Sequence, residues 1–338
     1  HEPPRARGEP TSAVAMLVLI SAAPSLFARA PFTARRVFVG SGPATGRSKV
    51  LAGLQPRSRP VAMADSFVDD EVEMMGQKVV ARRFVEADVG MTFPKKPLHD
   101  ELFAREWPEK YPFPPDAFKR QDEQDDSDFY STPRLVYHID EGAVRSLTNY
   151  YKENIAPGSS VLDICSSWVS HYPADFPETM ERISATGMNA LELQANRQLS
   201  DFEPKNLNVD ATLPYPDETF DTVTCVVSVD YLTRPLEVFK EARRVLRPGG
   251  KFILSQSNRC FPTKAIAMWL GMSDLQHCLV IGAYFHYSGG WSGARAYDVS
   301  PQGPNTNDPF FIVEATKEAG GDAEAEAGGG GAEGEWPR

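Results

Sequence analysis

Residues Ser160–His171 read Ser-Val-Leu-Asp-Ile-Cys-Ser-Ser-Trp-Val-Ser-His, and the rest of the chain is organised around them. Val161 and Leu162 are typical of the end of a buried strand, and Asp163 follows where this strand opens into a loop. An apolar strand, an acid, a loop of small residues and then a helix is the order in which α/β domains build nucleotide and nucleoside sites. The positions that usually carry glycine in such a loop hold Cys165, Ser167 and Val169.

Size and charge limit the classes of protein to which the chain can belong. Its 338 residues allow one domain of about 200 residues with extensions, or two small domains. The net charge of -11 argues against a general nucleic-acid binder, because phosphate contacts need a basic face. The charge is uneven: residues 1–60 carry nine Lys/Arg and two Asp/Glu, a net of +7, which leaves -18 for the rest.

The four cysteines are far apart and form no Cys-x-x-Cys pair; they are Cys165, Cys225, Cys260 and Cys278. This spacing argues against a metal site, and more strongly against a disulfide framework. Cys225 lies inside an apolar run and is predicted to be a core thiol. A reducing compartment fits this pattern best.

The first 64 residues have the composition of a targeting leader. From Pro10 to Ala64 there is no Asp or Glu, and arginines are scattered among Ser, Thr and Ala, as in organelle transit peptides. The apolar run Ala13–Ala23 is shorter than the roughly 20 residues that span a bilayer, although it fits the apolar region of a signal sequence. We expect residues 1–64 to direct the chain to a plastid and the mature protein to have no integral membrane segment. A plain disordered tail, with a mitochondrial or cytoplasmic location, is the alternative.

Composition divides the remaining chain into three parts. Residues 65–132 are rich in proline and aromatic side chains between Phe93 and Phe118, which predicts an extended arm laid over a domain. Residues 133–317 carry the regular hydrophobic patterns of that domain. Residues 318–338 are mostly Gly, Ala and Glu, a composition that cannot form a core and predicts a disordered tail.

Within residues 133–317, predicted strands and helices alternate. Ile139, Ala143, Leu147 and Tyr151 recur at the spacing of one helix face, with Asp140 as the candidate N-cap. Strands are predicted at Ser160–Ile164, Arg182–Met188, Asn206–Val209, Thr222–Val229, Lys251–Ser255 and Phe310–Ala315. Further helices are predicted at Glu178–Glu181, Ala190–Asn196, Pro235–Leu246 and Thr263–Trp269. This alternation predicts an α/β fold, a mostly parallel sheet with helices on both faces.

Three motifs in this region resemble a known family. They are Val161-Leu-Asp163, Leu213-Pro-Tyr-Pro-Asp-Glu-Thr-Phe-Asp221 and Glu241-Ala-Arg-Arg-Val-Leu-Arg-Pro-Gly-Gly250. In this order they resemble the class I S-adenosylmethionine-dependent methyltransferases, and most of all the type 11 group, which includes quinone-pathway enzymes. The wording Asp-Ile-Cys-Ser-Ser-Trp at 163–168 further resembles a plant, algal and cyanobacterial branch. The resemblance covers about residues 137–317 and implies a Rossmann-like, seven-stranded, mostly parallel sheet.

The resemblance also implies a set of residues that bind the cofactor, S-adenosyl-L-methionine. Asp163 corresponds to the acid that holds the cofactor's ammonium group, by charge-assisted bonding. Asn189 stands where the family usually has an acid that accepts from both ribose hydroxyls, and an amide oxygen accepts only one such bond well. Asp210 corresponds to the partner of the adenine amino group. The other expected cofactor contacts are Cys165, Ser166, Ser167, Met188, Ala211, Val227 and Ser228.

The missing glycines bear directly on this expectation. A β-carbon in the left-handed backbone region costs about 1–2 kcal/mol per residue. Cys165, Ser167 and Val169 therefore either take ordinary dihedral angles in a wider loop or hold the cofactor differently. Ordinary structural roles also remain open for the other residues: Asp163 as a cap, Asn189 as a turn residue and Asp210 as a loop residue.

Methyl transfer from a sulfonium needs a nucleophile held in line, and an oxygen, nitrogen or activated-carbon nucleophile can also need a base. Asp230 and Tyr231 follow the strand at Thr222–Val229 and are the candidate catalytic residues, with helix capping as the alternative for Asp230. Residues 258–291 are rich in aromatic side chains, which predicts a small, partly apolar acceptor. The sequence therefore predicts a methyltransferase, with a catalytically inactive binding or scaffolding protein as the alternative. The oligomeric state stays open.

Overall fold

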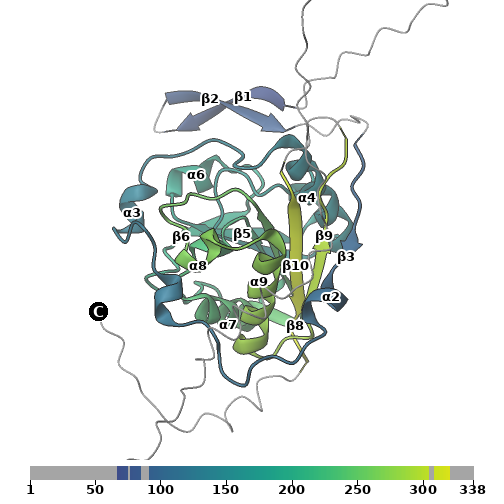
Figure 1. Cartoon of the computed structure of the whole chain (residues 1–338). Helices are drawn as coiled ribbons and strands as arrows, with labels where there is room; N and C mark the ends of the chain where they lie inside the picture. Colours follow the sequence, from purple (N-terminus) through teal and green to yellow (C-terminus); the bar gives the residue numbers. More distant parts are fainter. Residues whose placement is uncertain (1–66, 75–76, 85–90, 304–307, 320–338) are drawn as a thin grey trace, which may run out of the picture. The chain divides into compact units, whose positions relative to one another are not determined.

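The computed structural model describes residues 67–74, 77–84, 91–303 and 308–319 (Figure 1). The chain divides into two units, His1–Ala64 and Asp65–Arg338, and every described residue belongs to the second unit. The predicted leader and nearly all of the predicted tail lie outside the described residues. None of the helices within the described ranges is both long and apolar enough to cross a bilayer.

An eight-stranded sheet forms the centre of the second unit, in the order β3-β9-β10-β8-β7-β4-β5-β6. The run from β8 to β6 is parallel, whereas β10 is antiparallel to both of its neighbours. The strands are β3 (Lys96–Pro97), β4 (Ser160–Ile164), β5 (Arg182–Gly187), β6 (Asp201–Pro204), β7 (Phe220–Val226), β8 (Leu246–Ser257), β9 (Arg295–Asp298) and β10 (Phe310–Thr316).

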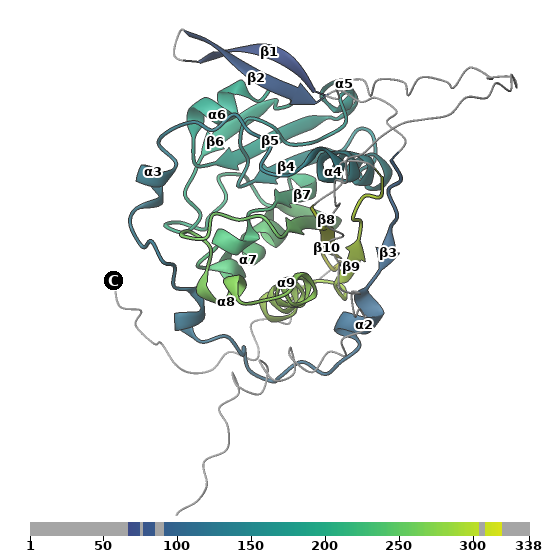
Figure 2. The ribbon, with the colours of Figure 1, turned by 45° about the horizontal axis from the view of Figure 1, so that its top comes forward.

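Alternating side chains of these strands feed two cores, one on each face of the sheet. Val161 packs in the core that contains helix α4 (Glu141–Asn154), and its neighbour Leu162 packs in the core that contains α7 (Pro235–Val245) and α9 (Asp274–Ser288). Figure 2 shows α7 and α9 together on one side of the sheet and α4 on the other. The prediction of a mostly parallel sheet with helices on both faces is confirmed.

Shorter elements complete the described chain. Strands β1 (Phe67–Met74) and β2 (Gln77–Phe84) pair only with each other, as an antiparallel hairpin. The short helices are α2 (His99–Phe103), η1 (Pro115–Phe118), α3 (Asp126–Phe129), α5 (Phe176–Thr179), α6 (Ala190–Ala195), η2 (Val229–Tyr231) and α8 (Ala267–Leu270).

Several local predictions are confirmed by the structure. The Asp140 side chain caps α4 by accepting a hydrogen bond from the backbone N–H of Ala143 at 2.8 Å. Strand β4 covers Ser160–Ile164, the predicted range, and every residue in it is buried. Cys225 is a fully buried thiol, as its position in an apolar run predicts.

The predicted strand at Asn206–Val209 is wrong, because β6 lies earlier, at Asp201–Pro204, and turns follow it. This strand forms one edge of the sheet, so its side chains are mostly exposed and show no apolar run. It begins with an ion pair across the sheet, in which Arg182 donates to both carboxylate oxygens of Asp201 at 2.7 and 2.9 Å. A charged edge strand of this kind has no hydrophobic alternation, so the sequence pattern does not predict it.

Several other boundaries also differ from the predictions: the strand predicted at Lys251–Ser255 is β8, and the helix predicted at Glu178–Glu181 is α5. The strand predicted at Thr222–Val229 ends at Val226, because Val227 adopts a φ of 37° and turns the chain. The helix predicted at Thr263–Trp269 is reduced to α8, because the backbone of Ile266 is extended and donates to the carbonyl of Asp230. The sheet has eight strands instead of seven because residues 96–97, from the predicted arm, pair with β9.

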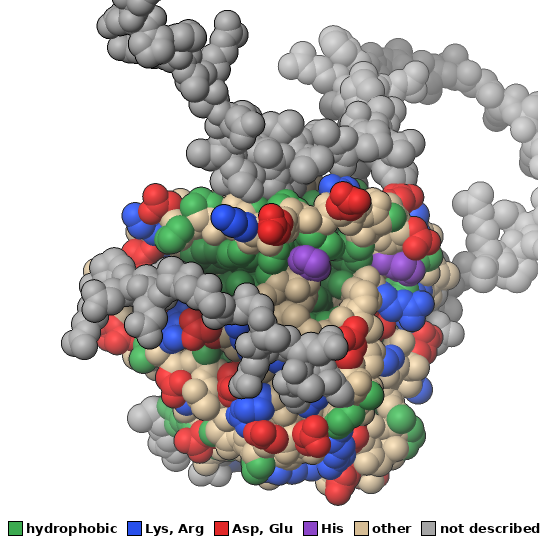
Figure 3. Space-filling view, turned by 90° about the horizontal axis from the view of Figure 1, so that it is seen from below, with side chains coloured by type: hydrophobic (Ala, Val, Ile, Leu, Met, Phe, Trp, Pro, Cys, Tyr) green, Lys and Arg blue, Asp and Glu red, His purple; other side chains and the backbone are tan. Residues whose placement is uncertain are grey.

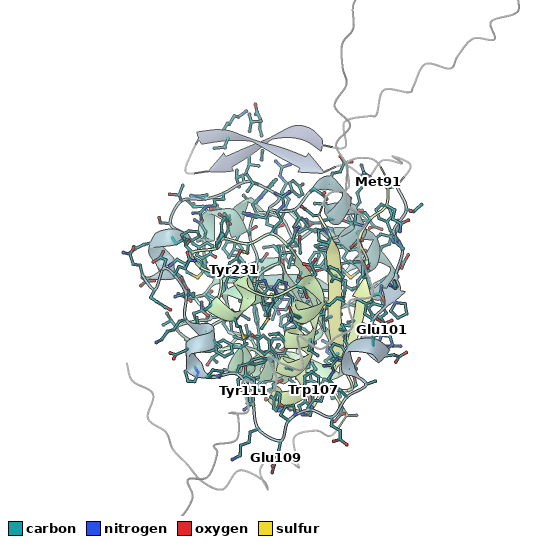
Figure 4. All side chains as sticks on the ribbon, viewed as in Figure 1. Met91, Glu101, Trp107, Glu109, Tyr111 and Tyr231 are labelled. Atoms are coloured by element: carbon teal, nitrogen blue, oxygen red, sulfur yellow. The ribbon has the colours of Figure 1, made fainter. Side chains whose placement is uncertain are left out.

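The segment between β3 and α4 crosses the α9 side of the sheet. The Trp107 ring stacks on His286 of α9 at 5.3 Å, and Tyr111 meets Tyr287 edge-on at the same distance. Seen from below, hydrophobic side chains gather in a hollow on this face (Figure 3). Trp107 and Tyr111 lie at the lower end of the view, well away from Tyr231 (Figure 4). After these contacts with α9, the chain continues to residues 120–138. Residues of this segment line the cavity at the ends of the parallel strands.

Candidate active site

A cavity of about 330 Å³ opens at the carboxyl ends of the parallel strands. Its walls come from the segments after β4, β5, β6, β7 and β8, within residues 163–171, 187–192, 205–208, 226–232 and 259–264. Residues between 120 and 138 close it from the side of the arm. The strand order reverses next to β4, and such a switch point is where open α/β sheets bind their ligands.

Asp163 is the buried carboxylate of this cavity. It is 2% exposed, and its two oxygens accept from the Ser166 hydroxyl at 2.6 Å and the Thr224 hydroxyl at 3.1 Å. Burial raises the pKa of Asp163 to about 6, while these hydrogen bonds partly oppose the shift. A carboxylate held in this way is oriented in advance for a cationic group.

The loop after β4 contains one residue in the left-handed region. Cys165 has a φ of 55°, whereas Ser167 and Val169 do not have positive φ. The expectation of ordinary dihedral angles therefore holds for Ser167 and Val169 and fails for Cys165. Five residues other than glycine have positive φ among the described residues, and four of them line the cavity: His138, Cys165, His171 and Val227. Backbone strain concentrated in this way is typical of functional sites.

The close approach that loop glycines usually permit occurs here at Gly187, the last residue of β5. A β-carbon on Gly187 would lie 2.1 Å from the carbonyl oxygen of Ser166. The Ser166 backbone N–H donates to the Thr186 carbonyl at 2.7 Å, which fixes the loop against the end of β5. The glycine that this site requires therefore stands on the neighbouring strand.

Asn189 lines the cavity, but its side chain is fully bonded within the protein. Its oxygen caps α6 by accepting from the N–H groups of Leu191 at 2.9 Å and Glu192 at 3.1 Å. Its nitrogen donates to the carbonyls of Tyr130 and Ser131 at 2.8 and 3.3 Å. Asn189 thus ties the 120–138 segment to α6, and the structure leaves it no spare acceptor for a ribose hydroxyl.

Asp210 and Ala211 lie outside the cavity wall. Asp210 forms an ion pair with Lys205 at 2.5 Å and accepts from the Thr212 N–H, and these contacts lower its pKa to about 2. Ala211 is buried in the core on the α7 side. Because β6 ends at Pro204, the cavity is lined by the next four residues, Lys205 to Asn208.

Asp230 and Tyr231 differ in their access to the cavity. Asp230 is 3% exposed and is not part of the wall; its Oδ2 has no hydrogen-bond partner among the described residues, and burial raises its pKa to about 8. Tyr231 lines the cavity, and its hydroxyl accepts from the Phe261 N–H at 2.8 Å. The other expected contacts that line the cavity are Cys165, Ser166, Ser167, Met188, Val227 and Ser228.

Several wall residues were not predicted from the sequence. Glu192 is 7% exposed, accepts from the Arg134 backbone N–H at 2.7 Å, and has its pKa raised by burial. His171 is 7% exposed, its Nδ1 has no hydrogen-bond partner in the described part of the chain, and burial lowers its pKa to about 3, so it is neutral. His138 lies edge-on to Phe261 at 5.6 Å, and burial lowers its pKa. No motif marks these residues; the one signal for Glu192 was its place one turn after Asn189.

Part of the chain is similar in sequence to known proteins. Residues 165–254 match the model of a family described as a methyltransferase domain. The demethylmenaquinone methyltransferase of Bacillus mycoides is 30% identical over 120 residues, which cover 31% of this chain and 48% of that enzyme. The chain thus spans about half the length of such curated relatives, 48% to 49% for three of them.

Two solved structures align with about half of this chain. The 4+2 cyclase SpnF gives a TM-score of 0.40 at 18% identity, over 52% of this chain and 82% of the cyclase. Phosphoethanolamine N-methyltransferase 2 of Haemonchus contortus, solved with S-adenosyl-L-methionine, gives a TM-score of 0.40 at 11% identity, over 54% of each chain.

Proposed function

We propose that this protein is an S-adenosylmethionine-dependent methyltransferase that acts on a small, partly apolar acceptor. The observation that carries the proposal is the cavity at the switch point of the sheet, with the buried, oriented carboxylate of Asp163 in its wall. The match of residues 165–254 to a methyltransferase domain supports the same reading. The resemblance to quinone-pathway enzymes supports an acceptor of quinol-like size.

The residues present fit the cofactor, with two changes of role. Asp163 holds the ammonium group of the methionine part, as the sequence predicts. Since the Asn189 side chain is fully bonded, Glu192 takes the ribose hydroxyls: it lines the same wall, one turn after Asn189, and carries an acidic side chain. Asn206 takes the place expected of Asp210 at the adenine edge, because it follows β6 closely and lines the cavity.

The bound cofactor supplies an electrophilic methyl group; the chain supplies position and a dry environment. Val227 and Ser228, just after β7, line the cavity and would form the wall next to the transferred methyl group. Tyr231, Phe261 and His138 face the acceptor, and the aromatic rings exclude water from it. Because the Tyr231 hydroxyl already accepts from Phe261, its proton stays free to be donated to an acceptor oxygen and orient it.

Proton removal from the acceptor requires a group with cavity access. Asp230 has no such access, and with a pKa of about 8 it is protonated at neutral pH. His138 lines the cavity, and burial lowers its pKa, so its neutral ring has a nitrogen lone pair. His171 also lines the cavity, but with its pKa lowered by burial to about 3 it is too weak a base to keep a proton. We propose that His138, rather than Asp230, receives the acceptor's proton where one must leave.

The proposal is tested by calorimetric titration of the full chain with S-adenosylmethionine and with S-adenosylhomocysteine. We expect saturable binding of both, and loss of most of the affinity in Asp163→Ala. If neither molecule binds at millimolar concentration, the proposal that this protein is a methyltransferase is wrong. Binding that is unchanged in Asp163→Ala would instead show that the carboxylate is misassigned.

A catalytically inactive protein of the same fold is the alternative. The observation that favours it is the left-handed conformation of Cys165, a residue with a β-carbon, in the loop that meets the cofactor. An inactive protein that has lost the cofactor site would bind neither molecule in the same titration. One that keeps the cofactor only as a stabiliser would bind both and transfer no methyl group. For location, we propose a plastid. The support is the acid-free, arginine-bearing composition of residues 10–64.

A further inference from the structure

Five Lys and Arg side chains line the cavity, and four of them are ion-paired. Lys205 pairs with Asp210 at 2.5 Å and Arg259 with Asp308 at 2.8 Å. The other two share one carboxylate: Asp126 lies 2.7 Å from Arg120 and 3.2 Å from Lys264. Among the described residues, the fifth cation, Arg134, has no ion pair with any carboxylate.

The Arg134 guanidinium is nevertheless fixed in place. Its Nη2 donates to the Phe129 carbonyl at 2.9 Å, and its carbon lies 4.5 Å from the Phe129 ring centre and 5.5 Å from that of Phe261. Its backbone N–H is bonded to Glu192 at 2.7 Å. Aromatic contacts of this kind hold a guanidinium plane without neutralising its charge.

The bonding capacity of this group is mostly unused. A guanidinium has five N–H donors, and in the described part of the chain Phe129 supplies its one acceptor. The Nη1 atom is buried and has no hydrogen-bond partner there. A buried, unbonded donor on a permanent cation is costly unless a ligand completes it, and the planar fork matches a carboxylate in two parallel bonds.

We infer that Arg134 is the anchor of a carboxylate-binding subsite in the cavity. The inference rests on the proposed function and deepens it: the ligand's carboxylate belongs either to the methionine part of the cofactor or to the acceptor. Both sources present the same chemistry to Arg134. In either case the subsite selects an acid over its neutral amide.

The test uses two matched pairs of ligands on the full chain. The first pair is S-adenosylhomocysteine and its carboxamide; the second is 4-hydroxybenzoate and 4-hydroxybenzamide, measured by ligand-observed NMR with and without S-adenosylhomocysteine. We expect the native chain to prefer the acid by about tenfold in one pair, since a charge-assisted, bidentate contact is lost in the amide. The pair that shows the preference identifies the source.

The variants separate charge from folding. Arg134→Gln should abolish the preference, and Arg134→Lys should keep part of it because the charge remains. Arg234→Gln is the matched control, an exposed arginine outside the cavity wall, and should bind all four ligands as the native chain does. The inference is overturned if the native chain shows no acid preference in either pair, or if Arg134→Gln retains it. If the proposed function is wrong, the result differs: the native chain binds neither S-adenosylhomocysteine nor its carboxamide.

Discussion

The carbonyl oxygen of Ser166 lies 2.1 Å from the point that a β-carbon on Gly187 would occupy. Because real β-carbons do not approach an oxygen so closely, the loop after β4 can rest on β5 only while residue 187 is glycine. The contact explains how a loop without its usual glycines still closes one wall of the cavity: the missing space is supplied by the neighbouring strand.

Gly187→Ala should therefore displace the loop. We expect the free energy of unfolding to fall by about 1–3 kcal/mol, the usual cost of overpacking, and cofactor affinity to fall at least severalfold. Chemical denaturation and calorimetric titration measure the two effects. Gly271→Ala is the matched control, because a β-carbon added there would meet no atom within 4 Å and its φ is -97°. Equal behaviour of the two variants would refute the contact.

Cys165 offers a second test of the same loop. With a φ of 55°, it bears the strain of a β-carbon in the left-handed region. Cys165→Gly should relieve this strain and Cys165→Ala should keep it. After allowance for the greater freedom of glycine in the unfolded chain, we expect Cys165→Gly to be more stable than Cys165→Ala by about 0.5–1 kcal/mol. The reverse order in urea denaturation would show that Cys165 is unstrained.

The sequence predicted the fold well because the core is periodic. Val161 and Leu162 alternate between two cores, and α7 begins at Pro235, as predicted. It predicted the site less well. The motif around Asp163 was legible, whereas β6 was misplaced because an exposed edge strand held by Arg182–Asp201 carries no hydrophobic pattern. Arg134 and His138 reach the cavity through the path of the segment just before α4, which no local pattern encodes.

The displacement of β6 yields a prediction about the adenine edge of the site. Asn206 lines the cavity, and Asp210 is bonded instead to Lys205 and Thr212. Asn206→Ala should weaken S-adenosylhomocysteine binding severalfold, the effect of losing about one hydrogen bond. Asp210→Ala should leave the affinity within about twofold of the native value, because its contacts are local and exposed. Calorimetric titration decides between the two residues. A loss of affinity confined to Asp210→Ala would mean that Asp210 contacts the adenine amino group, as the resemblance implies.

Asp230 makes a prediction about pH. Its folded pKa of about 8 lies above the ordinary value of 3.8, because burial disfavours the charged form. Between these values the folded state binds more protons than the unfolded state, so this carboxyl lowers stability as the pH rises from about 4 to about 8. Asp230→Asn keeps the shape and removes the charge. The stability difference between the variant and the native chain should therefore grow in the variant's favour over that range.

We expect the advantage of Asp230→Asn to be small near pH 4 and on the order of a few kcal/mol at pH 8.5, since each unit of pKa shift corresponds to about 1.4 kcal/mol. Urea denaturation of both proteins across this range measures it. Asp163 has a smaller shift, to about 6, and is present in both proteins, so its contribution cancels in the difference. If the stability difference between the two proteins does not vary with pH, Asp230 is hydrated in solution. Asp230 would then again be a candidate for accepting a proton in the cavity.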